Sequence, residues 1–466
     1  MPCLGICLCV LGLMTCGAWS ADQPDQNVQA KMSLADAVSM ALDENPNLKK
    51  AEQSQSAARA RLRVANIFSS YDLSTTAGMA HSPNSSDRSS QLLTQMTYAN
   101  MRGTEVSLGL SPLATGTDRG SVGLAVRHPL SQGKGLFSDK AYALEGAKIG
   151  STTEEKQYYL TRQATIQGVI ESYFRAVEAR DQVKVEESAV QIAQTAADGA
   201  REKANEMQIT EIEVSRAEIR VAQTKDQLNI QKQSAQGALD QLMLAIGKGI
   251  GASPELTDTV PVVDSQLPTL AEAIDKALSN RAELSVYDLQ IADQERSVAM
   301  SKDKLRPRLD VVAGFNSTSP DSGLIGKSLY DLGAFTAGLE YHVPMDKRSL
   351  VEDQNTAQSN LDVLRKLRLF QMDQVAESVR NAYRAVEASK VSVEILGQNV
   401  KVAQDNLALA QEMLDEGLDD NRNVLDGQDA LTRAESGLLS AKVDLYLAAV
   451  NLKYAMGEDL ATIGKL

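Results

Sequence analysis

The chain has 466 residues, of which 43% are hydrophobic, 23% are charged and only 4% are aromatic. This composition argues against a disordered chain, and the small aromatic share argues against one large compact core, which usually relies on Phe, Tyr and Trp. The formal net charge of −14, with no basic stripe, argues against nucleic acid as a partner, because phosphate binding depends on clustered Lys and Arg.

The first twenty residues are typical of a secretory signal. All four cysteines lie between residues 3 and 16 of an apolar segment, which is followed by the small-residue sequence Ala18-Trp19-Ser20. The segment is shorter than the about 20 apolar residues that a membrane-spanning helix needs, so we expect cleavage near Ser20. In a second interpretation the signal ends before Cys16, and Cys16 is a lipid attachment site similar to a bacterial lipobox.

Two similar halves follow the signal. The segments SLADAVSMALDENPNL (33–48) and TLAEAIDKALSNRAEL (269–284) match without a gap. Each segment is predicted to begin a helix with a capping box, in which a Ser or Thr is paired with an acidic residue three positions later. These pairs are Ser33 with Asp36 and Thr269 with Glu272. The sequence therefore predicts two internal structural repeats.

The predicted organisation has three parts. They are a signal peptide at 1–20, a first repeat at 21–253 with strands at about 71–130 and long helices at about 137–247, and a second repeat at 254–466 with strands at about 308–343 and long helices at about 347–457. The pentapeptide RAVEA occurs in both repeats, within 171–180 and within 380–389. The two copies of RAVEA are closer together in the sequence than the starts of the two repeats are. This difference implies that the second repeat lacks a segment that the first repeat carries around residues 80–120.

Strand-like runs separate the short helices from the long ones. In the first repeat they are YDLSTTAGMA (71–80) and SVGLAVRHPL (121–130), and in the second they are LDVVAGFN (309–316) and FTAGLEYHV (335–343). The last two alternate between an apolar and a polar face. A further strand-like pair, TQMTYANMRGTEVSLGL (94–110), has no counterpart in the second repeat.

The four matched strands suit either a soluble sheet or a membrane wall. No segment after the signal is a candidate membrane helix, because charged residues interrupt every apolar stretch. Four strands are too few to close a barrel, since small membrane barrels need about eight. We therefore expect several chains to share one barrel.

The long helices carry a narrow apolar seam. From Met372 to Leu414 apolar residues recur at alternating spacings of three and four, which is typical of coiled-coil packing. Breaks are predicted at EGLDDNRNVLDGQDAL (416–431) and, in the first repeat, at NEMQITEIEV (205–214). Each break is expected to fold its helix back as an antiparallel pair.

The chain resembles the TolC family of outer-membrane efflux and secretion channels. The residues that carry the resemblance are the two L-A-x-A-x-x-x-A-L openings, the junctions VRHPLSQGKG (126–135) and YHVPMDK (341–347), and the break at 416–431. The resemblance implies an α+β fold and a homotrimer. In it, each chain gives four strands to one 12-stranded outer-membrane β-barrel, which a long α-helical coiled-coil periplasmic tunnel continues.

The resemblance also implies a function. The protein is expected to be a passive exit duct for tripartite efflux or type I secretion, surrounded by outer-membrane lipid and opened at its periplasmic helix tips by a periplasmic adaptor (membrane fusion protein) and an inner-membrane pump. The exported substrate, whether drug, metal, metabolite or polypeptide, would be selected by these partners. The alternative is a secreted coiled-coil scaffold or surface protein without channel activity.

The resemblance places a gate at the second break. Asp426 matches the second aspartate of the family's G-x-x-x-x-x-D-V-L-D-A turn, Asn423 stands where the first is expected, and Asp419 stands where some members have a basic residue. The candidate tip residues are Asp415, Gly417, Asp419, Asp420, Asn423 and Asp426. Three copies of the acidic residues would favour cations at a narrow mouth. Alternatively, these aspartates only solvate a loop and cap the next helix.

No other chemistry is predicted. The three histidines, His81, His128 and His342, lie on or beside strands without ligand-spaced partners, and we expect them at the barrel or an interface. The sequence contains no phosphate-binding loop and no recognisable catalytic triad. The chain is therefore predicted to be neither an enzyme nor a holder of a cofactor or metal.

Overall fold

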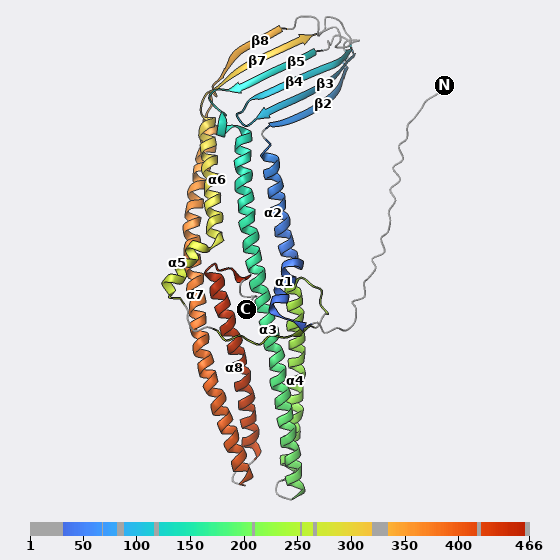
Figure 1. The fold of residues 1–466 in the computed structure, drawn as a ribbon, viewed down its shortest axis with the longest axis vertical. Coiled ribbons are helices and arrows are strands. Elements are labelled where there is room, and N and C mark those ends of the chain that lie inside the picture. Colours follow the sequence, from blue (N-terminus) through green and yellow to red (C-terminus); the bar gives the residue numbers. More distant parts are fainter. Residues whose placement is uncertain are drawn as a thin grey trace, which may run out of the picture.

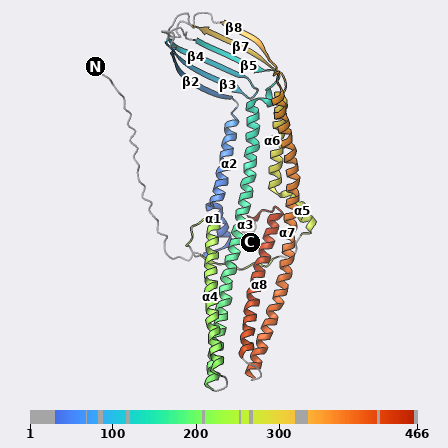
Figure 2. The same ribbon diagram turned by 180° about the vertical axis from the view of Figure 1, so that it is seen from behind.

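A computed structural model describes residues 31–67, 69–81, 88–115, 121–206, 210–251, 254–263, 268–318, 334–416 and 421–461. The molecule is elongated. An antiparallel sheet forms one end, and helices run from it to two tips at the opposite end (Figure 1). The view from behind shows the same separation of sheet and helices (Figure 2).

The helices come in short and long pairs. They are α1 (Leu34–Glu44), α2 (Pro46–Ala65), α3 (Asp139–Asn205), α4 (Glu211–Ile246), α5 (Leu270–Asn280), α6 (Ala282–Lys304), α7 (Arg348–Asp415) and α8 (Asn421–Ala455), with a 3₁₀ turn at Gly135–Phe137. Within the described ranges, no helix combines the length and the apolar character that crossing a bilayer requires.

The predicted capping boxes are confirmed. At α1 the Ser33 hydroxyl accepts a hydrogen bond from the Asp36 N–H at 3.3 Å, and the Asp36 carboxylate accepts one from the Ser33 N–H at 3.1 Å. Thr269 and Glu272 form the same reciprocal pair at α5. Each box satisfies two backbone donors that the first helical turn leaves without partners.

The core lies near the middle of the molecule, where α1, α3, α4 and α8 meet. Its fully buried side chains from α3 are Ile166, Val169, Ile170, Tyr173, Phe174, Ala176 and Val177. Val177 of the first RAVEA and Val386 of the second are both completely buried, Val177 in this core and Val386 in a second one between α5, α7 and α8, so the repeated pentapeptide gives each long helix an equivalent buried valine. Beside the core, β1 (Lys31–Met32) pairs in parallel with β6 (Glu255–Leu256).

The predicted seam of α7 is confirmed. Val375, Val379, Val386, Ala403 and Leu407 are buried, and the other seam positions are half-buried. Both predicted breaks are also correct, since α3 ends at Asn205 and α7 ends at Asp415 before their partners begin. Helix α3 packs along α4, and α7 packs along α8, as two helical hairpins (Figure 1).

The sheet has six strands, because the strand-like pair predicted at 94–110 joins the four strands expected in the barrel. Its order is β2-β3-β4-β5-β7-β8, and every neighbouring pair is antiparallel. The strands are β2 (Ser69–His81), β3 (Arg88–Asn100), β4 (Glu105–Thr115), β5 (Ser121–Pro129), β7 (Arg308–Thr318) and β8 (Ala334–His342).

The prediction of four strands per chain is therefore wrong. The segment without a counterpart in the second repeat forms β3 and β4, which enter the sheet between β2 and β5. Strand β3 pairs with β2 over its whole length, and β4 pairs with β5 from Glu105 to Ser111. In the single chain the sheet is open, and β2 and β8 are its edges.

Four helices join the sheet in the same order as its strands. Helix α2 leads into β2, β5 leads to α3, α6 leads into β7, and β8 leads to α7. Helix α2 packs on α3, α3 packs on α6, and α6 packs on α7. The helices that join the sheet thus form one continuous layer.

Candidate functional site

The sequence-predicted tip residues lie where α7 turns into α8. Gly417, Asp419 and Asp420 fall outside the described residues, and Asp415 is described only as the last backbone position of α7. Asn423 and Asp426 lie in the first two turns of α8, and both side chains are exposed.

Asp426 carries an accessible charge. Its carboxylate oxygen lies 3.9 Å from Nε of Arg422, four residues earlier on α8, and both side chains are more than two-thirds exposed. Such an exposed pair contributes at most about 1 kcal/mol and is screened by salt. The structure therefore leaves Asp426 available to ions in solution.

A second polar cluster near the tips was not predicted. Arg220 of α4 contacts the carboxylate of Asp429 on α8, and Arg433 lies 3.7 Å from the same carboxylate. The carboxylate of Glu186 on α3 is buried beside Arg220. We call Glu186, Arg220, Asp429 and Arg433 the inter-hairpin link, because it joins the two helical hairpins.

Burial and neighbouring charges shift the pKa values of two groups in the inter-hairpin link. Burial lowers the pKa of Arg220, and Arg433 lowers it further, whereas Glu186 and Asp426 oppose the shift. Burial raises the pKa of Glu186, which the nearby Arg220 charge only partly offsets. Each charge therefore depends on the others to compensate for its lost hydration. No sequence signal pointed to the link, because a lone Arg on a helix usually indicates a solvated face.

Polar contacts continue between the two hairpins towards the core. Arg175 of α3 forms a 2.8 Å ion pair with Asp444 of α8. Gln182 donates to the Ser436 carbonyl at 3.0 Å, and Gln167 donates to the Asn451 side chain at 2.7 Å. All three of these contacts join α3 to α8. They are polar, so water can replace either partner when the hairpins separate.

Within each hairpin the buried seam near the tips is apolar, although exposed ion pairs such as Lys232 with Glu187 also join α3 to α4. Ala197 and Ala200 of α3 pack against Ala217 of α4. In the other hairpin, buried Leu407 of α7 lies against Gly427 of α8, where an added Cβ would stand 3.4 Å from the Leu407 Cα. Apolar contacts resist separation in water. Near the tips each hairpin is therefore held by apolar packing, whereas closer to the core the two hairpins also share apolar contacts, such as Phe174 of α3 on Tyr446 of α8.

The sheet has one apolar face. Direct cross-strand partners form one row that runs through all six strands, and none of its side chains is buried. This row, which we call the apolar row, consists of Leu73, Met96, Leu108, Leu124, Phe315 and Phe335. The predicted alternation of the strands in the second repeat is confirmed, because Phe315 pairs with Phe335 and Val311 pairs with Leu339.

The opposite face is polar or carries small residues. Thr97, Ser107, Ala125, Gly314 and Thr336 form one of its rows. Near the helices this face carries ion pairs, in which Arg127 contacts Glu340 at 2.8 Å and Arg308 contacts buried Asp310 at 2.7 Å. The two faces of the sheet therefore suit two different environments.

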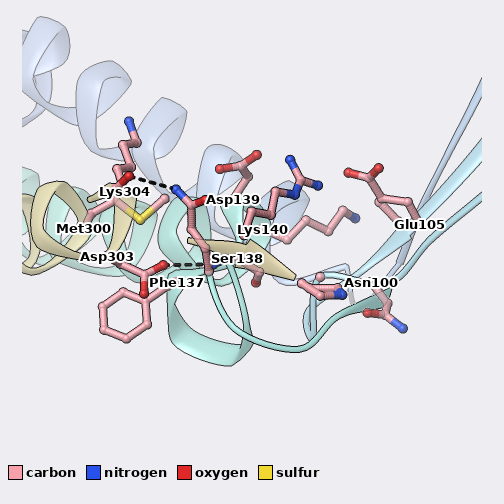
Figure 3. Close-up of a pocket in the computed structure, with 15 residues that line it drawn as sticks. Asn100, Glu105, Phe137, Ser138, Asp139, Lys140, Met300, Asp303 and Lys304 are labelled. Carbon is pink, nitrogen blue, oxygen red and sulfur yellow. Dashed lines mark hydrogen bonds between the residues drawn. The ribbon is translucent and has the colours of Figure 1, made fainter. Parts of the chain in front are cut away.

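A cavity of about 200 Å³ lies at the junction of sheet and helices (Figure 3). Its polar groups bond to one another. The Gly133 N–H donates to the Asp303 carboxylate at 2.8 Å, and the Gln132 amide donates to the Lys304 carbonyl at 3.2 Å. These bonds hold the chain that enters α3 against the end of α6. The residues around the cavity therefore fix the geometry of the junction.

The histidines lie on strands, as predicted. His81, His128 and His342 belong to β2, β5 and β8. His128 Nδ1 lies 2.8 Å from the Thr104 hydroxyl, which binds β5 to the turn before β4. In the ranges that the structure describes, no three His, Cys, Asp or Glu side chains gather as metal ligands would.

Comparison with known proteins gives one family. A family model described as outer membrane efflux protein matches residues 37–248 and 273–458. No curated protein sequence matches the chain.

Several solved structures share the fold. The outer membrane protein VceC of Vibrio cholerae is similar with a TM-score of 0.70 and 15% identity, over 91% of this chain and 96% of that one. The CmeC outer membrane channel of Campylobacter jejuni gives 0.68 and 16%, over 98% and 94%. The MtrE outer membrane channel of Neisseria gonorrhoeae, in its open state, gives 0.70 and 14%, over 92% and 89%.

Proposed function

Because the chain belongs to the outer membrane efflux protein family, we propose that it is a passive exit duct of a tripartite efflux or type I secretion route. It resides in the outer membrane, and its helices extend into the periplasm. The duct itself needs no catalytic group or cofactor, because energy comes from the partner pump.

The observation that carries this proposal is the exposed apolar row. Its edge residues Leu73 and Phe335 are 68% and 73% exposed, which water disfavours. In the outer membrane this face contacts lipid, and the polar face lines the lumen. A secreted scaffold, the alternative interpretation, would leave the whole row in water.

The edges of the sheet favour a homotrimer. In lipid, each unpaired backbone group costs several kcal/mol, so β2 and β8 need partners that the single chain lacks. We propose that three chains close one barrel through these edges.

The division of the chain remains a proposal, with a signal at 1–20 and repeats at 21–253 and 254–466. Lipidation of Cys16 is also a proposal. Extraction and mass spectrometry of the mature chain would test the cleavage of the signal and the lipidation.

We place the gate at the helix tips. Near the tips, polar contacts between the hairpins and apolar contacts within them allow the tips to separate, while each hairpin and the apolar core between α3 and α8 stay intact. Opening breaks the inter-hairpin link and leaves the hairpin seams unchanged. A periplasmic adaptor and an inner-membrane pump would bind at these tips. Asp415, Gly417, Asp419, Asp420, Asn423 and Asp426 remain proposed members of the mouth.

Oligomeric mass tests the proposal directly. Extraction from isolated outer membranes, followed by light scattering corrected for bound detergent, should give the mass of three chains. The same preparation should conduct ions in planar bilayers. A monomer recovered without membranes, and without conductance, would contradict the proposed duct.

A further inference from the structure

The hairpin β3–β4 is fully integrated into the sheet. Strand β3 pairs with β2 from Ser69↔Asn100 to His81↔Arg88, which is the whole length of both strands. Strand β4 pairs with β5 from Glu105↔Arg127 to Ser111↔Ser121. Strand β2 has no ladder with β5, so without the hairpin these two strands would have to form a new pair.

The two faces of the sheet continue through the hairpin. Met96 and Leu108 belong to the apolar row, while their neighbours Thr97 and Ser107 lie on the polar face. The register shift between β3 and β4 lies farther from the helices, between Leu92 and Thr94, and leaves these pairs in place. A shift of one residue at these pairs would reverse the two faces. The hairpin therefore has the register that a membrane wall requires, which a loop lying outside the wall would not need.

Hydrogen bonds and a close backbone contact hold the turn of the hairpin in one conformation. The Asn100 side chain accepts hydrogen bonds from the Arg102 and Thr104 N–H groups at 2.9 and 3.0 Å. Gly103 has φ of 85°, and a Cβ there would stand 2.7 Å from the Gly133 carbonyl oxygen. Only glycine combines this backbone conformation with so close an approach.

The same turn is bonded to the helical layer. The Ser138 hydroxyl, which caps α3, donates to the Met101 carbonyl at 2.8 Å. Residues Asn100 and Gly103 line the junction cavity together with Asp303 of α6 (Figure 3). The hairpin is thus anchored at the level where the other strands meet their helices.

We propose that β3 and β4 are transmembrane wall strands, so that three chains of six strands close an 18-stranded barrel. This inference rests on the proposed homotrimer. It replaces the 12 strands that the resemblance implied, and it assigns the free edges β2 and β8 to neighbouring copies of this chain.

The edges suit such closure. Strands β2 and β8 run in opposite directions, because successive strands in the sheet alternate, so β8 of one copy meets β2 of the next as an antiparallel pair. Neither edge strand contains Pro or Lys, the residues that commonly protect a free edge. Pairing there also carries the apolar row from Phe335 of one copy to Leu73 of the next.

The dimensions of the two layers agree with the proposal. Six strands spaced by about 4.8 Å and tilted by about 40° cover roughly 38 Å of wall, whereas four cover roughly 25 Å. The four helices that join the sheet cover roughly 32–40 Å at about 8–10 Å each. Closed three times, the six-stranded sheet gives a barrel roughly 36 Å across, compared with roughly 24 Å for twelve strands.

Single cysteines test whether β3 lies in the wall. Met96→Cys and Gln95→Cys probe adjacent residues of β3, and Leu339→Cys and Gly338→Cys are the matched pair on β8. Full-length trimers in lipid vesicles are treated with a water-soluble maleimide. We expect labelling at 95 and 338, and loss of labelling at 96 and 339, where lipid shields the thiol.

The pattern separates the two levels of the proposal. Equal labelling at 95 and 96, with alternation kept at 338 and 339, would place the hairpin outside the wall and overturn the 18-stranded barrel while the duct stands. Equal labelling at 338 and 339 would remove the sheet from the membrane and overturn both. Electron cryomicroscopy of the same trimers gives an independent count, in which 18 strands support the inference and 12 contradict it.

Discussion

Arg220 and Asp429 join the two helical hairpins of the chain near their tips. Each residue lies between two and three turns from the start of its helix. This ion pair must separate if one hairpin is to move away from the other. Its side chains are 29% and 19% exposed, so water weakens it less than it weakens a surface pair.

Removing Arg220 should favour the open tip. The Arg220→Ala change deletes hydrogen bonding to a charged group, which is worth about 1.5–3 kcal/mol, and so raises the ratio of open to closed channels by roughly ten- to a hundredfold. Single-channel recording in planar bilayers measures this ratio.

Arg216→Ala is the matched control. Arg216 also lies on α4, but it pairs with Glu213 of its own helix, and its loss should leave gating unchanged. An Arg220→Ala, Asp429→Ala double variant should open no more often than Arg220→Ala alone, because the pair is already broken in the single variant. Equal conductance in all four proteins would show that the link does not hold the tips.

Neutralising Asp426 should weaken cation preference. Three exposed carboxylates at a narrow mouth attract cations, so Asp426→Asn should reduce the cation-to-anion permeability ratio severalfold and relieve block by polyvalent cations. Reversal potentials in a salt gradient measure the ratio. Asp362→Asn, an exposed change in the sheet-side part of α7, should alter neither property. Unchanged selectivity in Asp426→Asn would remove this residue from the mouth.

Glu186 should make stability depend on pH. Burial raises the pKa of Glu186 in the folded state above 4.5, its value in an unfolded chain. The folded state then holds this proton more tightly, so its stabilising effect is complete below 4.5 and is lost as pH rises through the folded-state pKa.

Glu186→Gln imitates the protonated form at every pH. At neutral pH it should raise the temperature at which helical circular dichroism is lost, and this gain should shrink as pH falls towards 4.5. The neighbouring Glu187→Gln affects an exposed side chain paired with Lys232 and should show no such trend. A gain that stays constant with pH would contradict the assigned protonation.

Gly247 should not tolerate a side chain. It ends α4 with φ of 94°, and a Cβ would stand 2.9 Å from the Asn45 Cα at the joint of α1 and α2. We expect Gly247→Ala to lower the free energy of unfolding by at least about 1–2 kcal/mol. Gly237→Ala, in the middle of the same helix with open space around it, should instead raise it by about 0.5–1 kcal/mol. Denaturant melts of both variants give the comparison, and equal effects would contradict it.

Local patterns in the sequence were sufficient for most of the helical part. The capping box at Ser33 and the seam from Met372 to Leu414 are set by residues close in sequence, whose spacing fixes which side of a helix is buried. The position of Asp426 in α8 followed from the family's turn pattern, although its role remains a proposal.

Contacts between segments that are distant in the sequence could not be predicted from local patterns. The Arg220–Asp429 pair depends on how two hairpins pack, and nothing in either local sequence reports it. The strand count failed for a related reason. The segment 94–110 has a strand-like pattern, but its place between β2 and β5 depends on hydrogen bonds to strands outside it, which the alternation of side chains alone does not specify.

The junctions at the base of the sheet have a consequence for how the strand number can change in evolution. Strand β2 leaves α2, and β5 returns to α3, whether or not residues 88–115 stand between them. A whole hairpin adds two strands and returns the chain to the side it left, so the number of strands stays even and the helices keep their connections. In the proposed barrel, one in-frame insertion or deletion of such a hairpin would therefore change the calibre of the pore, while the connections between strands and helices stay the same.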